Sequence, residues 1–174
     1  ANPCSRTAPC KTFAGAISKT AAKGEINCID PGGFGAVTIT KAITISCPNV
    51  EAGVLVSGTN GIIVNTAAVG DVVVLEGLDI EGLGTGLNGV RIVSGSDYIR
   101  NCTIRDFQGA APNGNGVFVN GAASSRVFVT DSKIANNRNG VDVLGSAADG
   151  SVANAAVLDN ILLDKNSSFS LRVS

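Results

Sequence analysis

Asn115-Gly116-Val117-Phe118-Val119 belongs to a motif that recurs along the chain and decides its fold. The same Asn-Gly dipeptide, followed by an apolar-x-apolar triplet, begins at Asn60, Asn88, Asn115 and Asn139, and a degenerate copy follows at 167–171. The four Asn residues lie 28, 27 and 24 positions apart. A period of this length indicates a solenoid, in which each repeat forms one structural unit.

A second pattern runs alongside the first. Gly77, Asn101, Asp131 and Asp159 each precede an inward-outward-inward triplet, and a further apolar pair lies just upstream of each of them. We expect Gly53 and Glu25 to open the same strand in the two earliest coils. Each period then holds three short strands with one apolar face each. They bury those faces when the chain winds into coils that stack, with equivalent strands paired in parallel roughly 4.7–4.9 Å apart.

The corner residues fit this architecture. Asn and Gly tolerate a positive φ, so we expect the Asn-Gly pairs to form sharp corners, with corner geometry rather than ligand binding as their role. A β-sandwich is the alternative fold, but it does not predict the same dipeptide at the start of the same strand four times. A single flat parallel sheet is excluded because connections this short cannot hold its crossovers.

Residues 11–24 are expected to form a capping helix. Phe13, Ile17 and Ala21 are spaced at i, i+4 and i+8, and Thr12 is a candidate N-cap. Such a helix would cover the apolar interior and strand edges at the open end of the first coil. The chain is then a single domain over residues 1–174, with about five coils in residues 25–174.

Composition excludes several classes of function. A net charge of -1 gives no long-range field that would attract a polyanion, so nucleic acid is not an expected partner. No apolar run approaches the roughly 18 residues of a membrane span. The chain has no His and no CxxC spacing, so neither a metal site nor a cofactor is expected.

Five cysteines indicate an oxidising compartment, and we expect the protein to be secreted or periplasmic. Cys4 with Cys10, and Cys28 with Cys47, are the plausible disulfide pairs. Cys102 is then the odd cysteine, expected to be a buried thiol that packs like a small apolar residue.

With coils of this length and Asn or Asp at the tight corner, the chain resembles the right-handed parallel β-helix proteins of the pectate-lyase-like superfamily. Its segments 10–17 and 33–39 are similar to those of small secreted bacterial β-helix proteins of undetermined role. The resemblance implies a right-handed parallel β-helix with three strands per coil. In enzymes of this superfamily, polysaccharide is cleaved or epimerised on the outer face of one sheet.

The resemblance does not extend to a known activity. Polygalacturonases of the superfamily use three Asp residues with His and Arg-x-Lys motifs nearby, and this chain has no His. Pectate lyases hold Ca²⁺ with clustered Asp residues. Here Asp79, Asp106 and Asp142 are expected on different strands or loops, so no carboxylate cluster is predicted.

One outward row on the Asn-Gly strands is the candidate binding surface. Arg91, Phe118 and Asp142 are middle residues of successive coils, which places them roughly 5 Å apart. Arg91 can stack on Phe118, and Asp142 can accept a hydrogen bond from a sugar hydroxyl. Asp106 and Arg138 would line the groove beside them. The alternative is ordinary surface decoration, with Phe118 covered by the loop at 105–115.

These patterns predict a secreted, non-catalytic β-helix module that contacts extracellular polysaccharide or a surface assembly. One alternative is a minimal polysaccharide lyase or epimerase that works at Arg91 and Asp142. Another is a structural protein that forms homo-oligomers through its C-terminal coil. In that coil, we expect Phe169, Leu171 and Val173 to form a strand, with no capping helix after it.

Overall fold

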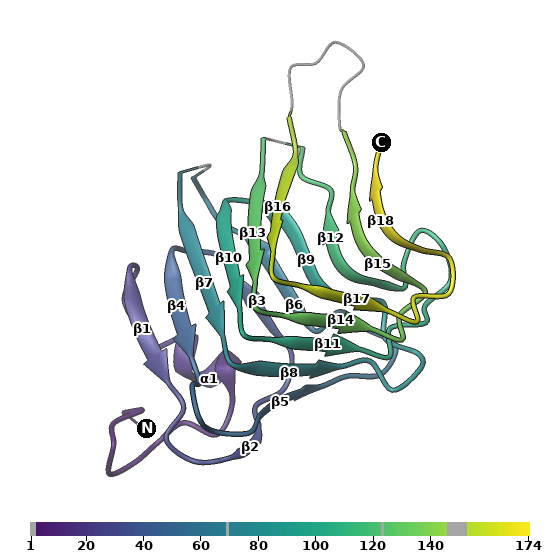
Figure 1. Cartoon of the computed structure of the whole chain (residues 1–174). Coiled ribbons are helices and arrows are strands. Elements are labelled where there is room, and N and C mark those ends of the chain that lie inside the picture. Colours follow the sequence, from purple (N-terminus) through teal and green to yellow (C-terminus); the bar gives the residue numbers. More distant parts are fainter. Residues whose placement is uncertain (1–2, 69, 123, 146–152) are drawn as a thin grey trace.

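The computed structural model describes residues 3–68, 70–122, 124–145 and 153–174. Its strands form a parallel β-solenoid with three six-stranded sheets, and each coil contributes one strand to each sheet (Figure 1). Strands that are equivalent in successive coils pair in parallel, as Asn115 on one strand does with Asn88 and Asn139 on its two neighbours. The predicted parallel three-strand coil is confirmed, and the β-sandwich alternative is wrong.

The three sheets are named here by their order along each coil. Sheet 1 contains β1 (Gly24–Asn27), β4 (Ile43–Ser46), β7 (Val72–Glu76), β10 (Ser96–Arg100), β13 (Arg126–Thr130) and β16 (Ala155–Asp159). Sheet 2 contains β2 (Gly32–Gly33), β5 (Ala52–Leu55), β8 (Leu78–Glu81), β11 (Thr103–Arg105), β14 (Lys133–Ala135) and β17 (Leu162–Asp164). Sheet 3 contains β3 (Val37–Ile39), β6 (Ile62–Asn65), β9 (Asn88–Ser94), β12 (Asn115–Val119), β15 (Asn139–Val143) and β18 (Phe169–Val173).

Aliphatic side chains stack on their own equivalents inside the coils. Ile80, Ile104 and Ile134 occupy one position in three successive strands of sheet 2, and each is 0% exposed. A single coil would leave these side chains open to water on both of its ends. The core is therefore a property of the stack and not of any one repeat.

The Asn residues of the repeat form a buried amide ladder. The Nδ2 group of Asn88 donates to Oδ1 of Asn60 at 2.8 Å, Asn115 donates to Asn88 at 2.7 Å, and Asn139 donates to Asn115 at 2.8 Å. Asn88 and Asn115 are fully buried, where an amide needs hydrogen-bond partners. Each coil supplies the partner for the next, so the repeated Asn holds the coils in register.

The Gly residues of the repeat have a different role from the one expected. None of the four Asn-Gly pairs has a positive φ among the described residues. A Cβ on Gly61 would instead lie 2.7 Å from the carbonyl oxygen of Gly89 and 2.8 Å from Cγ2 of Ile80. The expectation of a positive-φ corner was therefore wrong, because it is close packing between coils that excludes a side chain here.

Positive φ occurs instead at the corner between sheets 1 and 2. The residues at this corner in four coils are Gly77, Asn101, Asp131 and Asn160, with φ of 72°, 49°, 50° and 48°. The first three are the predicted corner residues. In the last coil Asn160 takes the place predicted for Asp159, so Leu163 faces the core and Leu162 faces outward.

The register also differs from prediction elsewhere near the two ends of the solenoid. Phe169, and not Ser167, lies opposite Asn139. Gly24–Asn27 forms the first strand of sheet 1 and not of sheet 2, and Gly53 pairs with Asp79. These strands lie before the first Asn-Gly pair, at Asn60, or after the last one, at Asn139. An apolar alternation alone allows neighbouring registers there.

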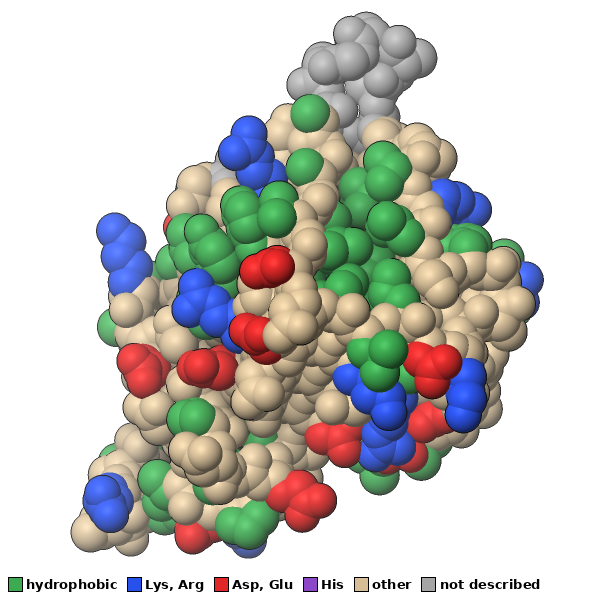
Figure 2. Space-filling model, viewed as in Figure 1, with side chains coloured by type: hydrophobic (Ala, Val, Ile, Leu, Met, Phe, Trp, Pro, Cys, Tyr) green, Lys and Arg blue, Asp and Glu red, His purple; other side chains and the backbone are tan. Residues whose placement is uncertain are grey.

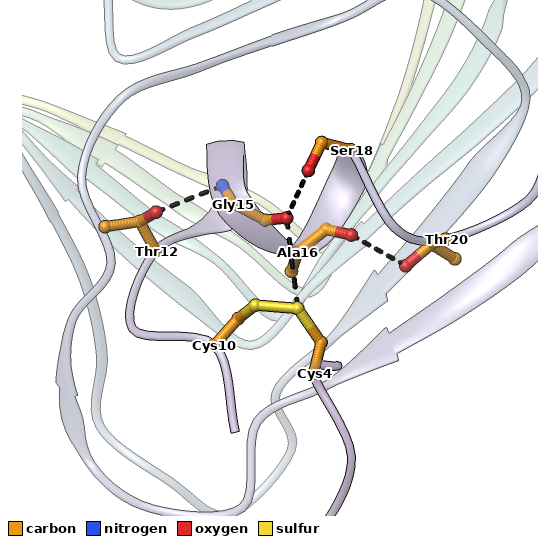
Figure 3. The surroundings of a disulfide bond; sticks show 7 residues. All are labelled: Cys4, Cys10, Thr12, Gly15, Ala16, Ser18 and Thr20. Atoms are coloured by element: carbon orange, nitrogen blue, oxygen red, sulfur yellow. Dashed lines mark hydrogen bonds between the residues drawn. A yellow bond between two sulfur atoms is a disulfide. The ribbon is translucent and has the colours of Figure 1, made fainter. Parts of the chain in front are cut away.

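The predicted cap is a shorter helix than the range 11–24. The helix α1 spans Phe13–Ile17. Its N-cap is Thr12, whose Oγ1 accepts a hydrogen bond from the Gly15 amide at 3.1 Å (Figure 3). Ser18 Oγ and Thr20 Oγ1 donate to the carbonyls of Gly15 and Ala16, and the Ala16 carbonyl also accepts from the amides of Lys19 and Thr20. These local side-chain bonds compete with helix extension, so the turn ends early.

Both predicted disulfides are present, Cys4 with Cys10 and Cys28 with Cys47. Cys102 is a buried free thiol, as expected, and burial raises its pKa to about 11. Among the described residues, no helix has the length and apolar character needed to cross a membrane.

Replacing Asn115 with Ala tests the amide ladder. Asn139 would lose its acceptor and Asn88 one of its donors, so Asn115→Ala should lower the free energy of unfolding by about 2–4 kcal/mol. Urea unfolding provides the measurement. Asn65→Ala is the matched control, because Asn65 is an exposed residue of the same sheet. Equal losses in the two variants would show that the ladder adds nothing.

Candidate functional site

The predicted row of outward side chains on sheet 3 is present in the structure. Phe118 on β12 lies directly opposite Arg91 on β9 and Asp142 on β15, and Arg172 on β18 extends the row by one coil. The residues that the sequence placed together are therefore neighbours in space.

Burial limits what this row can contact. Phe118 is 4% exposed and Asp142 is 0% exposed. Arg172 donates to both carboxylate oxygens of Asp142, from Nε at 2.8 Å and from Nη2 at 2.6 Å, and this ion pair raises the pKa of Arg172. Arg91 donates to Asn120 Oδ1 at 3.2 Å and is half-buried. The Asp142 carboxylate is therefore already occupied, and Arg91 is separated from it by a full strand.

Asp106 belongs to a different cluster. It accepts hydrogen bonds from Arg105 Nη1 at 3.2 Å and from the side-chain amide of Asn136. The Arg105 guanidinium also contacts Asp79 at 2.9 Å and Glu81 at 2.7 Å, and these carboxylates raise its pKa. Asp106 thus closes a charge network on the outer face of sheet 2.

Arg138 is the remaining residue of the predicted groove. Its side-chain carbons lie against Gly114, where they occupy the place that a side chain at 114 would need. Its amide donates to the carbonyl oxygen of Phe107 at 2.8 Å. These contacts place Arg138 at the loop that leads into β12, packed against the backbone.

Two half-buried aromatic side chains lie on the outer face of sheet 1, which the sequence patterns did not single out. Tyr98 on β10 and Phe128 on β13 are paired across adjacent coils, with ring centroids 4.9 Å apart and an interplanar angle of 12°. The Arg100 guanidinium lies 4.9 Å from the centre of the Tyr98 ring. Val74 and Val157 continue the same outward row on either side. We call Val74, Tyr98, Phe128 and Val157 the apolar row.

A polar row runs beside the apolar row, two positions further along each strand and on the same face. It consists of Glu76, Arg100, Thr130 and Asp159. Figure 2 shows apolar side chains gathered over sheet 1 with charged side chains below them. Thr130 and Asp159 have no side-chain hydrogen bond or ion pair within the described part of the chain.

A groove of about 370 Å³ follows the corner that comes directly after the polar row. Its lining includes Asn101, Asp131 and Asn160, with Thr103 and Lys133 on the sheet 2 side. Asn160 Nδ2 donates to Asp131 Oδ1 at 2.6 Å. The apolar row, the polar row and this groove are adjacent along the chain in three coils, and together they form one continuous surface.

One titratable group lies inside the core. Asp97 occupies an inward position of β10 between Val73 and Val127 and is 2% exposed. Neither of its carboxylate oxygens has a well-formed hydrogen bond in the described part of the chain. Burial raises its pKa to about 8, and the nearby backbone amide of Val73 offsets part of the rise. Asp97 is therefore a neutral carboxylic acid at and below neutral pH.

Comparisons with protein-family models, with curated proteins and with solved structures give no match to this chain.

Replacing Asp97 with Asn should flatten the pH dependence of stability. The unfolded chain releases this proton near pH 3.8 and the folded chain near pH 8, so the folded state binds the extra proton between those values. Stability therefore falls as pH rises through this window, by about 1.4 kcal/mol per pH unit from this group.

We expect the wild type to lose up to about 3 kcal/mol of unfolding free energy between about pH 5 and about pH 7.5, measured in urea. Asp97→Asn should lose much less and be the more stable protein at the higher pH. Asp30→Asn, at an exposed carboxylate, serves as the control. The same slope in wild type and Asp97→Asn would contradict this assignment.

Proposed function

We propose that the protein is a non-catalytic binding module that contacts an extended polysaccharide across the outward face of sheet 1. The observation that carries the proposal is the apolar row, with its stacked Tyr98 and Phe128, running beside the polar row. A secreted location and membership of the pectate-lyase-like superfamily are part of the same proposal. The two disulfides and the parallel β-helix fold support these two points.

A sugar chain needs two kinds of contact, and this surface offers both. Its rings present apolar C–H groups that pack against valine methyl groups and aromatic side chains. Its hydroxyls need donors and acceptors placed to one side, which Arg100, Thr130 and Asp159 provide. Thr130 and Asp159 have no side-chain partner within the described residues and can bond to a ligand without breaking an existing contact.

The shape of the surface favours a polymer over a small molecule. Equivalent side chains repeat once per coil, roughly 4.7–4.9 Å apart, along a face with no enclosing wall. A linear ligand that lies across several coils gains a little binding free energy at each one. The stacked rings are already ordered by their neighbours, which limits the entropy lost on binding.

Glycan binding by wild type and variants tests this proposal. A glycan array should identify a polysaccharide ligand, and the double variant Tyr98→Ala/Phe128→Ala should bind it roughly tenfold more weakly or worse. Arg91→Ala is the control, since Arg91 lies in the row on sheet 3. Product analysis on any bound glycan should show no cleavage or epimerisation.

Three results would contradict the proposal. The first is an array without any bound polysaccharide. The second is a loss of binding in Arg91→Ala with unchanged binding in the double variant, which would restore the sheet 3 row as the contact. The third is formation of a product, which would support the enzymatic alternative.

A second candidate function is self-association through the last coil. Leu171 and Val173 on β18 occupy core positions opposite Val141 and Val143, yet they are 48% and 70% exposed. The equivalent residues of β15 are 0% and 1% exposed, since the last coil covers them. Another copy seated on this end would bury the same kind of surface.

Light scattering tests self-association. The wild-type chain should form dimers or larger species as concentration rises, and Val173→Asp should remain monomeric. Leu55→Asp places the same charge at an exposed apolar residue of sheet 2 and should behave like the wild type. A wild type that is monomeric at every concentration removes this candidate.

A further inference from the structure

The end of the solenoid near the N-terminus holds a pocket that the proposed polysaccharide surface does not use. It has a volume of about 440 Å³ and lies between the first coil, the helix α1 and the loop closed by Cys4 and Cys10. Cavities of about 300–1,000 Å³ are typical of small-molecule sites in proteins.

The floor of this pocket is core surface that the cap leaves open. Ile26 and Cys28 on the first coil are equivalent to Ile45 and Cys47 on the next, which are 0% exposed. Ile26 and Cys28 are only half-buried, although they pack against the core. The short helix seals another part of the coil end with Phe13, which is 1% exposed. The apolar surface that α1 does not cover forms the floor of the pocket.

Two disulfides hold the walls of the pocket in place. The Cys4–Cys10 bridge lies against α1, with Cys4 Sγ 3.9 Å from the carbonyl oxygen of Gly15 (Figure 3). The Cys28–Cys47 bridge ties the first coil to the second. Phe34 stacks on Phe13 with ring centroids 4.9 Å apart and completes the apolar wall. The pocket is therefore formed before any ligand arrives, which lowers the cost of binding.

The polar groups around the pocket are unevenly charged. Its lining includes two acidic residues, Glu25 and Asp30, and one basic residue, Arg6. Within the described residues, none of these three side chains has a hydrogen bond, an ion pair or a ring contact. Two free carboxylates against one free guanidinium leave a net charge of -1 at the mouth of an apolar cavity.

We propose that this pocket binds a small molecule that has an apolar body and a cationic amine. The apolar body occupies the space over Ile26, Cys28 and Phe34, where it removes their exposed surface from water. The ammonium group lies at the mouth and is attracted by Glu25 and Asp30. The apolar body lies at the coil end and not over Tyr98 and Phe128, although Glu25 continues the outward row of sheet 1 through Thr44 and Val74.

Three probes with the same apolar chain separate the contributions. Octylammonium, 1-octanol and octanoate are titrated into the isotopically labelled, disulfide-intact protein and followed by NMR. Octylammonium should shift the signals of Ile26, Cys28 and Phe34 and bind roughly fivefold more tightly than 1-octanol. Octanoate should bind most weakly.

Charge variants then test the mouth of the pocket. In Glu25→Gln/Asp30→Asn the affinity for octylammonium should fall to that for 1-octanol. Asp164→Asn, which changes a carboxylate in the last coil, should leave it unchanged. Equal binding of the three probes, or an unchanged affinity in the double variant, would overturn the cationic class. Signal shifts outside the pocket, or no binding of any probe, would overturn the site. Binding of the three octyl probes does not test glycan binding over Tyr98 and Phe128.

Discussion

Hydrogen bonding between the side chains of successive coils is the constraint on which this structure depends. The amides of Asn60, Asn88, Asn115 and Asn139 form a ladder in which each group satisfies the next inside the core. Backbone pairing alone would permit a strand to shift by two residues, because the same side chains would still face the core. A shifted coil would leave buried amides without partners, so the ladder fixes one register and with it every row of side chains on the outer faces.

The sequence could predict the parts of the fold that carry the repeated Asn-Gly motif. The Asn-Gly period predicts the three parallel sheets and places Arg91, Phe118 and Asp142 side by side. Where the motif is missing, register follows from apolar alternation alone, and the strands around Asp159 and Ser167 were placed one or two residues away from their true positions. The role of the glycines was also beyond the sequence, because a clash with the neighbouring coil depends on the distance between coils and not on local backbone preference.

The candidate binding surface was harder to predict for a related reason. An outward position in a strand is not the same as an exposed one, and Phe118 and Asp142 show the difference by being almost fully buried. The pairing of Asp142 with Arg172 involves a coil whose register the sequence did not fix. Tyr98 and Phe128 did carry a signal, since Tyr98 is the single Tyr of the chain and lies one repeat before Phe128. Because Asp97 and Ile99 face inward on β10, Tyr98 between them faces outward, and Phe128 occupies the equivalent position on β13.

The amide ladder is incomplete at its last residue, Asn139. Oδ1 of Asn139 has no partner in the described part of the chain, because Phe169 stands opposite it in the last coil. This vacant acceptor marks a place where the architecture can be lengthened. A tandem duplication that inserted another Asn-Gly coil after β15 would meet a matching acceptor, a matching strand edge and a matching aliphatic column. Proteins of this design can thus gain length, and with it outer surface, by copying one coil at a time.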